Sequence, residues 1–560
     1  MTPTRHLTLV TLLLTMTRAA DSQQPPRPTT LAHRSTVYAP HGMIATSQPL
    51  ATAAGLAVLE RGGNAVDAAI TAAAVLNVVE PPMTGIGGDL FAIVWSAKDR
   101  KLYGLNASGR AGSLMTRAAL LAKGHATMPQ QTVEDVTVPG ALSGWDALLR
   151  RFGTVTLAQA LAPAIGYAEE GFPVTPIISA EWGAEAAKLR RDEGARATYL
   201  VEGGRAPRPG EWFRNPDLAR TLRLVADQGI GALYGGELGR RVADRVRVLG
   251  GYLTLDDFKH HRPEWVDPIS TTFQGYRVWE LPPNGQGVAV LEMLKILEPY
   301  DLKALGHNSA AYLHLLIEAK KLAYADLAQY VGEPTAMGVP AANFLTDAYA
   351  ASRRALIDPA RATDRPAPGK PETASETIYL TVADSSGNIV SFINSLYDAF
   401  GSGVVVPGTG FALQDRGAGF TLEPGLPNTV APGKRPFHTI IPAFVTRPDG
   451  TGGNAPWLSF GVMGGSMQPQ GHVQVLLNLI VFGMDLQDAI DAARFRHLEG
   501  RGVALEAPID DAVRRALAAL GHEVTSETAV AFGGAQAIMR LPRGYAGGSD
   551  PRKDGMAAGY

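Results

Sequence analysis

The sequence contains no cysteine, and it shows neither a block of basic residues nor sustained heptads or an internal repeat. Without cysteine the chain can form no disulfide, no thiol nucleophile and no Cys-ligated metal or iron–sulfur site. Basic residues number 51 and acidic residues 53, so the net charge is −2 and no nucleic-acid partner is predicted. The His-Glu-x-x-His, Gly-x-Ser-x-Gly and P-loop motifs are absent as well. We therefore expect neither a metal nor a cofactor.

The apolar run near the N-terminus covers residues 7–16 and is too short to span a bilayer. Arg5 and His6 precede this run and small residues follow it, which is the order found in secretory signal peptides. Because threonines interrupt the run, a frayed helix is the alternative. We expect a signal peptide over residues 1–20, a disordered leader over 21–35, and a periplasmic or secreted protein.

A mixed globular protein is indicated by the rest of the chain, which is long enough for a large buried core. Residues 49–61 are apolar at helical spacing and are followed by a glycine pair, which predicts a helix with a glycine stop. Asn64 then caps a predicted alanine-rich helix over 65–78. Residues 90–95 and 101–105 are predicted strands.

Residues 376–391 are predicted to form two strands joined by an Asp-Ser-Ser-Gly-Asn turn. Thr377 heads the first strand directly after Glu376, and residues 359–375 have the composition of an exposed linker. If the chain were cut between Glu376 and Thr377, the threonine would carry a hydroxyl and a free α-amine. That amine has a pKa of about 8 and can accept the hydroxyl proton. Local sequence alone favours an ordinary strand threonine, because threonine is common in strands.

Motifs along the chain change that interpretation. The segment Thr377-Ile378-Tyr379, followed by an alternating strand and Gly387-Asn388, resembles the processing site of the gamma-glutamyltransferase family of N-terminal-nucleophile hydrolases. Other segments match the family in the same order: 62–69, 85–88, 138–140, 161–164, 169–174, 281–287, 318–326, 400–403, 432–436, 464–466 and 550–555. The resemblance covers residues 36–560.

The resemblance implies a four-layer αββα sandwich of the α+β class, made as one precursor that cuts itself. The large subunit would comprise residues 36–376 and the small subunit residues 377–560, with the cleavage site between Glu376 and Thr377. It also implies hydrolysis of γ-glutamyl amides such as glutathione through an acyl-enzyme on Thr377, with transfer to an amine or peptide. Ile378 replaces a second threonine that is usual in the family.

The family match also assigns residues to the oxyanion and to the substrate. Gly464 and Gly465 follow a predicted strand over 457–460, and adjacent glycines let backbone N–H groups approach a developing negative charge. Taken alone, they would be a plain strand-to-helix turn. Arg110 matches the arginine that binds the substrate carboxylate, although most arginines simply lie on the surface. The residues assigned to the substrate are Arg110, Ser395, Tyr397, Arg416, His438 and Thr439.

Several positions depart from the family pattern. Residues 417–419 stand where transferases carry an acidic pair that binds the glutamyl α-ammonium, and Arg416 adds positive charge beside them. Tyr397 replaces an asparagine that contacts the glutamyl group. His438 and Thr439 replace a serine pair, and the histidine could be neutral or charged near physiological pH. Recognition of an ammonium group is therefore not predicted, and a dicarboxylate-like or plain acyl group fits these positions.

Three functional hypotheses are open at this point. The first is a γ-glutamyl amidohydrolase and acyltransferase, and the second is a related acylase for glutaryl or other small-acid amides. Both predict a small-molecule amide and an amine or peptide acceptor as partners, with no nucleic acid and no membrane span. The third is a non-catalytic binding protein that never cuts itself, and only Ile378 supports it.

Overall fold

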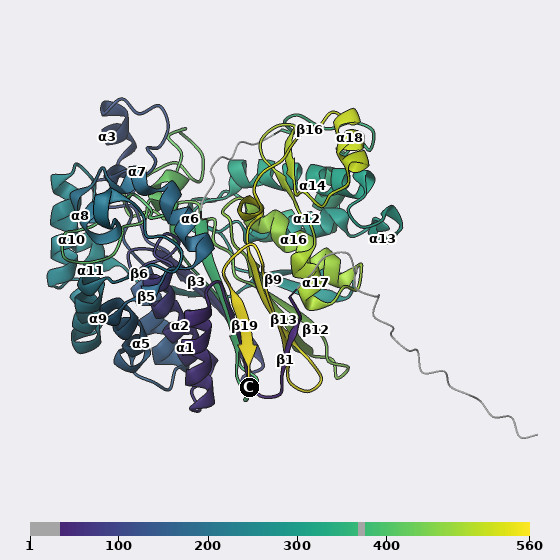
Figure 1. Ribbon diagram of the computed structural model, residues 1–560. Coiled ribbons are helices and arrows are strands. Elements are labelled where there is room, and N and C mark those ends of the chain that lie inside the picture. Colours follow the sequence, from purple (N-terminus) through teal and green to yellow (C-terminus); the bar gives the residue numbers. More distant parts are fainter. Residues whose placement is uncertain (1–33, 368–375) are drawn as a thin grey trace, which may run out of the picture.

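The computed structural model describes residues 34–367 and 376–560. The predicted signal peptide, nearly all of the predicted leader and residues 368–375 of the predicted linker lie outside the described residues. Two seven-stranded antiparallel sheets pack face to face, and a layer of helices covers the outer face of each sheet (Figure 1). The predicted αββα sandwich is confirmed.

Each sheet combines strands from distant parts of the chain. The first sheet has the order β1 (Val37–Ala39), β18 (Tyr545–Ser549), β17 (Ala535–Arg540), β13 (Asn454–Val462), β12 (Ala443–Pro448), β9 (Tyr276–Glu280) and β8 (Ile269–Phe273). The second has the order β19 (Met556–Gly559), β2 (Met43–Thr46), β10 (Glu376–Ala383), β11 (Ile389–Tyr397), β3 (Asp89–Ser96), β4 (Lys101–Ala107) and β7 (Glu264–Val266).

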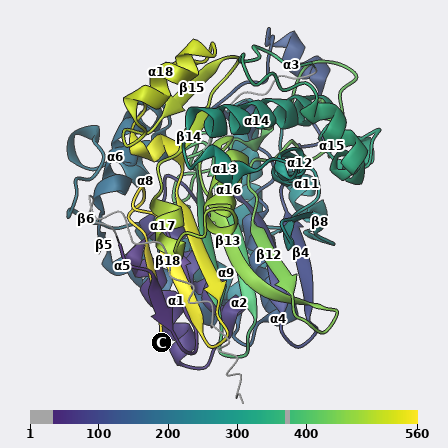
Figure 2. The same ribbon diagram turned by 90° about the vertical axis from the view of Figure 1, so that its right-hand side faces the viewer.

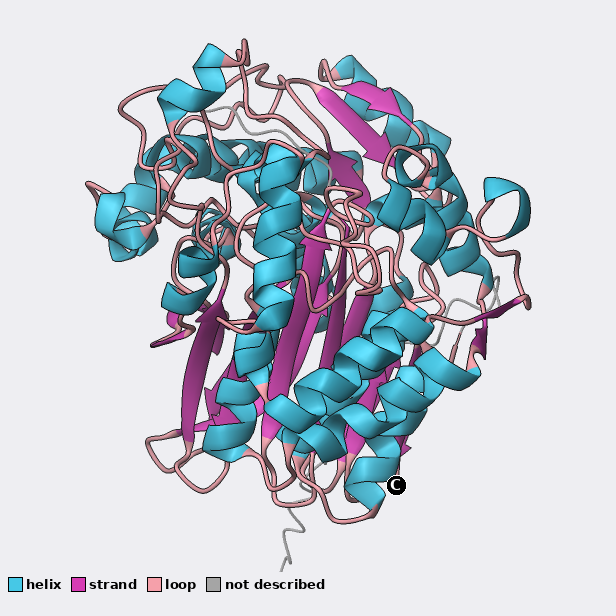
Figure 3. Ribbon diagram, turned by 90° about the vertical axis from the view of Figure 1, so that its left-hand side faces the viewer, coloured by secondary structure: helices cyan, strands magenta, loops and turns pink. Residues whose placement is uncertain are grey.

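Helices form the two outer layers. On the first sheet lie α12 (Gly287–Leu297), α16 (Met467–Ile480) and α17 (Leu486–Asp491), with α14 (Ala310–Tyr330), α15 (Asp347–Arg354) and α18 (Asp511–Ala519) outside them (Figure 2). On the second sheet lie α1 (Pro49–Glu60), α2 (Ala65–Val79) and α4 (Ala141–Phe152), with α5 (Leu157–Glu170) and α9 (Pro216–Gln228) farther out (Figure 3).

Shorter elements complete the chain. The helices are α3 (Arg117–Ala122), α6 (Pro176–Ala184), α7 (Ala186–Leu189), α8 (Glu193–Tyr199), α10 (Glu237–Val248), α11 (Leu255–His260) and α13 (Leu302–Leu305). Two small sheets contain β5 (Phe172–Pro173) with β6 (Trp212–Phe213), and β14 (Phe495–His497), β15 (Gly502–Leu505) and β16 (Glu523–Thr525). No helix within residues 34–367 and 376–560 combines the length and the apolar character needed to cross a membrane.

The predicted helices and strands near the N-terminus are confirmed as α1, α2, β3 and β4. Asn64 caps α2 as expected: its side-chain oxygen accepts hydrogen bonds from the N–H groups of Val66 at 2.9 Å and Asp67 at 3.0 Å. Asp67 accepts in turn from the N–H of Asn64 at 2.9 Å, which completes a capping box. A pattern that is complete within residues 64–67 therefore marks the helix start.

Strand β10 is buried on both faces. Ile378, Leu380 and Val382 belong to the core beneath the helices, whereas Tyr379 and Ala383 belong to the core between the two sheets. Alternate residues of a strand point to opposite faces, so burial on both sides requires a nearly continuous apolar run. The strand that carries Thr377 therefore lies inside the sandwich rather than at its surface.

Candidate active site

The bond predicted to be cut lies at an irregular point of the hairpin formed by β10 and β11. Glu376 is opposite Tyr397 and Ile378 is opposite Asn394, so the register shifts between these two pairs. Such bulges often occur next to active sites, where they redirect side chains. Tyr397 also has a φ of 90°, a left-handed conformation that is strained for a residue other than glycine. The backbone is thus distorted directly beside Thr377.

Gly464 and Gly465 form the predicted turn between β13 and α16. Their φ values are 113° and 56°, which favour glycine. The carbonyl of Gly465 accepts hydrogen bonds from the N–H of Gln468 at 3.1 Å and from Nε2 of Gln286 at 2.8 Å. No described residue accepts a hydrogen bond from the N–H of either glycine. The turn is therefore held by its carbonyl groups, and its N–H groups can serve an oxyanion at the N-terminal end of a helix.

Four of the residues assigned to the substrate meet around one buried guanidinium. Arg416 begins the short 3₁₀ helix Arg416–Gly419 and is fully buried. Its two terminal nitrogens donate hydrogen bonds to the hydroxyl oxygens of Thr439 and Ser395, each at 2.7 Å. Its guanidinium carbon lies 4.6 Å from the centre of the Tyr397 ring. Burial lowers the pKa of Arg416 to about 10, so it remains positively charged at neutral pH.

His438 lies behind this group and is neutral. Its Nε2 is 3.1 Å from Oδ2 of Asp89, and both side chains are fully buried. Burial, together with the charge of Arg416, holds the pKa of His438 well below its usual value. Burial also raises the pKa of Asp89 to about 6, although Arg416 opposes that change. The structure thus decides between the two charge states that the sequence left open for His438.

Arg110 does not join these residues. Its guanidinium pairs with Glu264 at 2.9 Å and with Glu333 at 3.2 Å, and it donates to the carbonyl of Gly433 at 3.0 Å. It is not among the residues that line the cavity described below. The geometry gives no support to the predicted contact between Arg110 and a substrate carboxylate, because the guanidinium nitrogens of Arg110 already pair with carboxylates of the chain itself. The contact stays a prediction.

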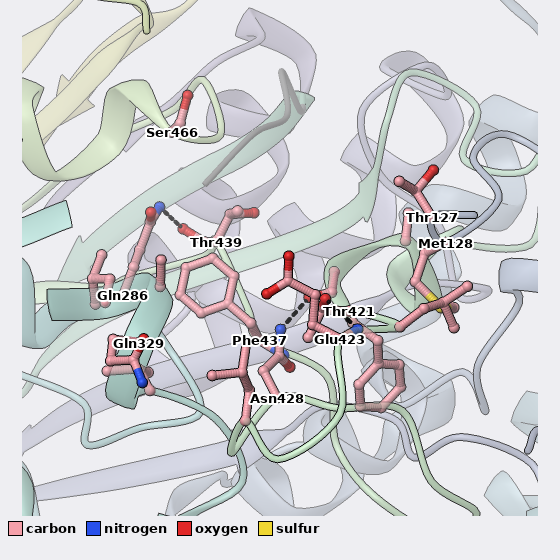
Figure 4. A pocket seen from close by; sticks show the side chains of 18 of the residues that line it. Thr127, Met128, Gln286, Gln329, Thr421, Glu423, Asn428, Phe437, Thr439 and Ser466 are labelled. Carbon is pink, nitrogen blue, oxygen red and sulfur yellow. Dashed lines mark hydrogen bonds between the residues drawn. The ribbon is translucent and has the colours of Figure 1, made fainter. Parts of the chain in front are cut away.

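A cavity of about 780 Å³ opens beside the buried arginine (Figure 4). Tyr397 and Thr439 are the residues of the predicted site that line it. Sequence reasoning missed several other wall residues, although Gln286 and Tyr324 belong to segments that match the family. The polar wall residues include Gln130, Gln286, Gln329, Asn428 and Ser466, and the apolar ones include Met128, Leu327, Val331, Phe420, Leu422, Leu426 and Phe437.

Two buried aspartates near Arg416 could in principle replace the missing acidic pair. Asp398 accepts a hydrogen bond from Gln131 at 3.1 Å, and Asp415 accepts one from the N–H of Asp398 at 3.1 Å. Neither aspartate lines the cavity. Burial and the neighbouring Asp398 raise the pKa of Asp415 well above its usual value, which disfavours its charged form. An ammonium group in the cavity therefore finds no carboxylate at this point.

Within the described residues, one cluster has the chemistry of a metal site: His314, Glu318 and His522. Nδ1 of His314 and Nε2 of His522 are 2.8 Å apart, and Lys321 donates a hydrogen bond to Glu318 at 2.8 Å. The two histidine nitrogens are hydrogen-bonded to each other and the glutamate accepts from a lysine, so the cluster is explained as a buried polar network.

A sandwich with two central antiparallel sheets and a threonine at the start of an inner strand defines the N-terminal-nucleophile hydrolase fold. Comparison with known proteins agrees. The family model for gamma-glutamyltranspeptidase matches residues 51–560, and the chain belongs to this family. It is therefore an enzyme of the hydrolase class built on this fold.

Individual relatives include both glutathione hydrolase-like and acylase proteins. The glutathione hydrolase-like YwrD proenzyme of Bacillus subtilis is 38% identical over 528 residues, which are 92% of this chain and 98% of that protein. The oxamate amidohydrolase proenzyme of Klebsiella pneumoniae is 38% identical over 536 residues, with 93% and 98% covered. The crystal structure of cephalosporin acylase from Bacillus halodurans is 45% identical, with a TM-score of 0.89 and 97% and 99% covered.

Proposed function

We propose that this protein is a self-processing amidohydrolase that releases small carboxylate-bearing acyl groups from amides. Cleavage between Glu376 and Thr377 would create the nucleophile. Glutaryl amides and γ-glutamyl amides such as glutathione both belong to this substrate class, and transfer to an amine or peptide would accompany hydrolysis. The names of the relatives support processing, since they are called proenzymes.

The reaction follows from the groups at the strand end. The Thr377 hydroxyl oxygen attacks the amide carbon while its proton passes to the α-amine of the same residue. The N–H groups of Gly464 and Gly465 would stabilise the negative oxygen of the tetrahedral intermediate. Collapse of this intermediate breaks the C–N bond, and the α-ammonium returns the proton to the departing amine. Water then attacks the ester by the same route and releases the acid.

The single observation that carries the acyl preference is the buried positive charge of Arg416. It lies directly behind Thr439 and Tyr397, which form part of the cavity wall. No described carboxylate forms an ion pair with it. A carboxylate on the acyl group would therefore be attracted to this end of the cavity, whereas an ammonium would be repelled. One relative is named for oxamate, whose carboxylate is next to its amide.

We expect the processed protein to discriminate weakly between glutaryl and γ-glutamyl anilides. An enzyme with a dedicated acidic partner rejects the analogue that lacks the ammonium, because the buried partner is left unpaired. Here the two values of kcat/KM at one pH should differ by no more than about tenfold, or about 1.4 kcal/mol, or favour the glutaryl compound. A preference for γ-glutamyl on the order of a thousandfold would show that the ammonium has a partner that this interpretation omits.

A further inference from the structure

One side chain of the predicted large subunit joins two parts of the predicted small subunit. Nε2 of Gln286 donates hydrogen bonds to the carbonyl oxygens of Thr439 at 2.6 Å and of Gly465 at 2.8 Å. An amide nitrogen has two donor positions and carbonyl oxygens only accept, so these contacts use both donors and fix which way the amide faces. Gln286 is buried and lines the cavity, where Figure 4 shows its side chain extending to Thr439. Gln286 thus ties the Thr439 backbone to the turn at Gly464 and Gly465, called the oxyanion turn below.

The backbone that carries Gln286 is anchored on the same small-subunit segment. The N–H of Gln286 donates to the carbonyl of His438 at 3.1 Å, and the N–H of His438 donates to the carbonyl of Asn284 at 2.9 Å. The Asn284 side chain donates to the carbonyl of Pro436 at 2.7 Å. Helix α12 begins at the next residue and packs on the first sheet. The Gln286 side chain therefore reaches the oxyanion turn from a fixed base.

Tyr324, also of the predicted large subunit, contacts the end of the oxyanion turn. Its hydroxyl donates to the carbonyl of Ser466 at 2.5 Å. Burial raises the pKa of Tyr324 well above its usual value, so the hydroxyl keeps its proton and remains a donor. The same carbonyl accepts from Nε2 of Gln470 at 3.3 Å, within the helix that follows the turn. Tyr324 thus holds the turn one residue beyond the carbonyl that Gln286 holds.

The two ends of the Gln286 link have different roles in the proposed reaction. At one end, the Thr439 hydroxyl accepts a hydrogen bond from Arg416, whose charge would attract the acyl carboxylate. At the other end, the N–H groups of the oxyanion turn would stabilise the negative oxygen that forms on the amide carbon. The separation of carboxylate and amide carbon is the length of the acyl chain. A link that fixes the separation of these two ends therefore fixes which chain length reacts well.

We propose that Gln286 is a positioning residue that sets the preferred length of the acyl chain. This inference rests on the proposed function and deepens it, because it concerns the acyl half of the same substrate. Gln286 acts through the oxyanion turn, which it holds at a fixed separation from the Thr439 end of the cavity. Because the oxyanion forms only during the reaction, a displaced turn lowers kcat rather than raising KM.

Succinyl, glutaryl and adipyl anilides test the proposal, since they differ only in the number of methylenes between carboxylate and amide. One methylene can change discrimination by about tenfold, and processed wild-type protein should prefer one length by about that factor in kcat/KM. Gln286→Met keeps the size of the side chain and removes both donors. It should lower kcat for the preferred anilide by about ten- to a hundredfold, with KM within about threefold. The three lengths should then differ by no more than about threefold in kcat/KM.

Further variants separate the link from the turn itself. Gln286→Glu replaces both donors by carboxylate oxygens and should flatten the length preference as Gln286→Met does. Tyr324→Phe removes a hydrogen bond to the turn and leaves the Gln286 link intact, so it should lower kcat for all three anilides by a similar factor and retain their order. Gln228→Met, at an exposed position at the end of α9, is the control and should change neither kcat nor the order.

The length preference is a ratio within one variant, so it does not depend on how much of the protein is folded or processed. If neither Gln286→Met nor Gln286→Glu gives active protein, Gln286→Asn, which keeps the amide on a shorter side chain, carries the same comparison. A preference that the Gln286 variants leave unchanged would overturn the inference alone, as would wild-type protein that hydrolyses all three lengths equally well. Wild-type protein that hydrolyses no anilide would overturn the proposed function with it.

Discussion

Thr377→Ala is expected to yield an uncut chain with no amidase activity. Removing the hydroxyl removes the atom that attacks the bond after Glu376 and the atom that attacks the substrate. Thr377→Ser keeps a hydroxyl at the same position and should retain part of both activities. A denaturing gel and intact-mass analysis of purified protein give the readout: wild type should contain a fragment that begins at Thr377 and ends at Tyr560.

Each other outcome has a distinct meaning. An alanine variant that is fully processed would show that another residue performs the cut. Wild-type protein that stays intact but hydrolyses amides would refute the requirement for an N-terminal amine. Protein that stays intact and is inactive would favour the non-catalytic binding protein that Ile378 first suggested.

Replacing Arg416 should remove the preference for an acyl carboxylate. The test compares glutaryl anilide with pentanoyl anilide, which has the same number of carbons and no carboxylate. Loss of a desolvated charge interaction costs on the order of 2–4 kcal/mol in transition-state binding. Arg416→Met should therefore lower the glutaryl-to-pentanoyl ratio of kcat/KM by about two orders of magnitude. Arg416→Lys keeps a positive charge and should retain more of the ratio.

Arg110→Met is the matched comparison, because the sequence assigned the carboxylate to Arg110. In the structure its partners are Glu264 and Glu333, so this substitution should leave the ratio within about threefold of wild type. A ratio measured within one variant does not depend on how much of the protein is folded or processed. If Arg110→Met abolishes the preference and Arg416→Met preserves it, the original assignment is right and Arg110 leaves its glutamates when substrate binds.

Features set by neighbours in the sequence could be predicted, and features set by distant contacts could not. Asn64 and Asp67 form a capping box three residues apart, so the start of α2 follows from local chemistry. The turn at Gly464 and Gly465 follows from the need for left-handed backbone. Both patterns are complete within a few residues, so the sequence alone identifies them.

The charge and partners of buried side chains depend on residues far away in the chain. His438 is neutral because it is fully buried and lies near the positive charges of Arg416 and Arg435, which no local pattern shows. Arg110 donates hydrogen bonds to Glu264 and Glu333, which lie more than a hundred residues away in the chain. The cavity wall likewise combines segments that only the fold brings together.

The strands before and after the bond between Glu376 and Thr377 are hydrogen-bonded to one another in both sheets. In the second sheet, β10 and β11 lie between β2 and β3; in the first, β12 neighbours β9 and β18 neighbours β1. Neither fragment alone contains a complete sheet, so assembly would have to precede scission, and the two products would remain interlocked afterwards. The precursor could refold as a single chain, whereas refolding of the mature protein would become a bimolecular reaction that depends on concentration. Heat inactivation of the mature protein would then be set by the rate of unfolding, because reassembly competes poorly with aggregation of exposed strands.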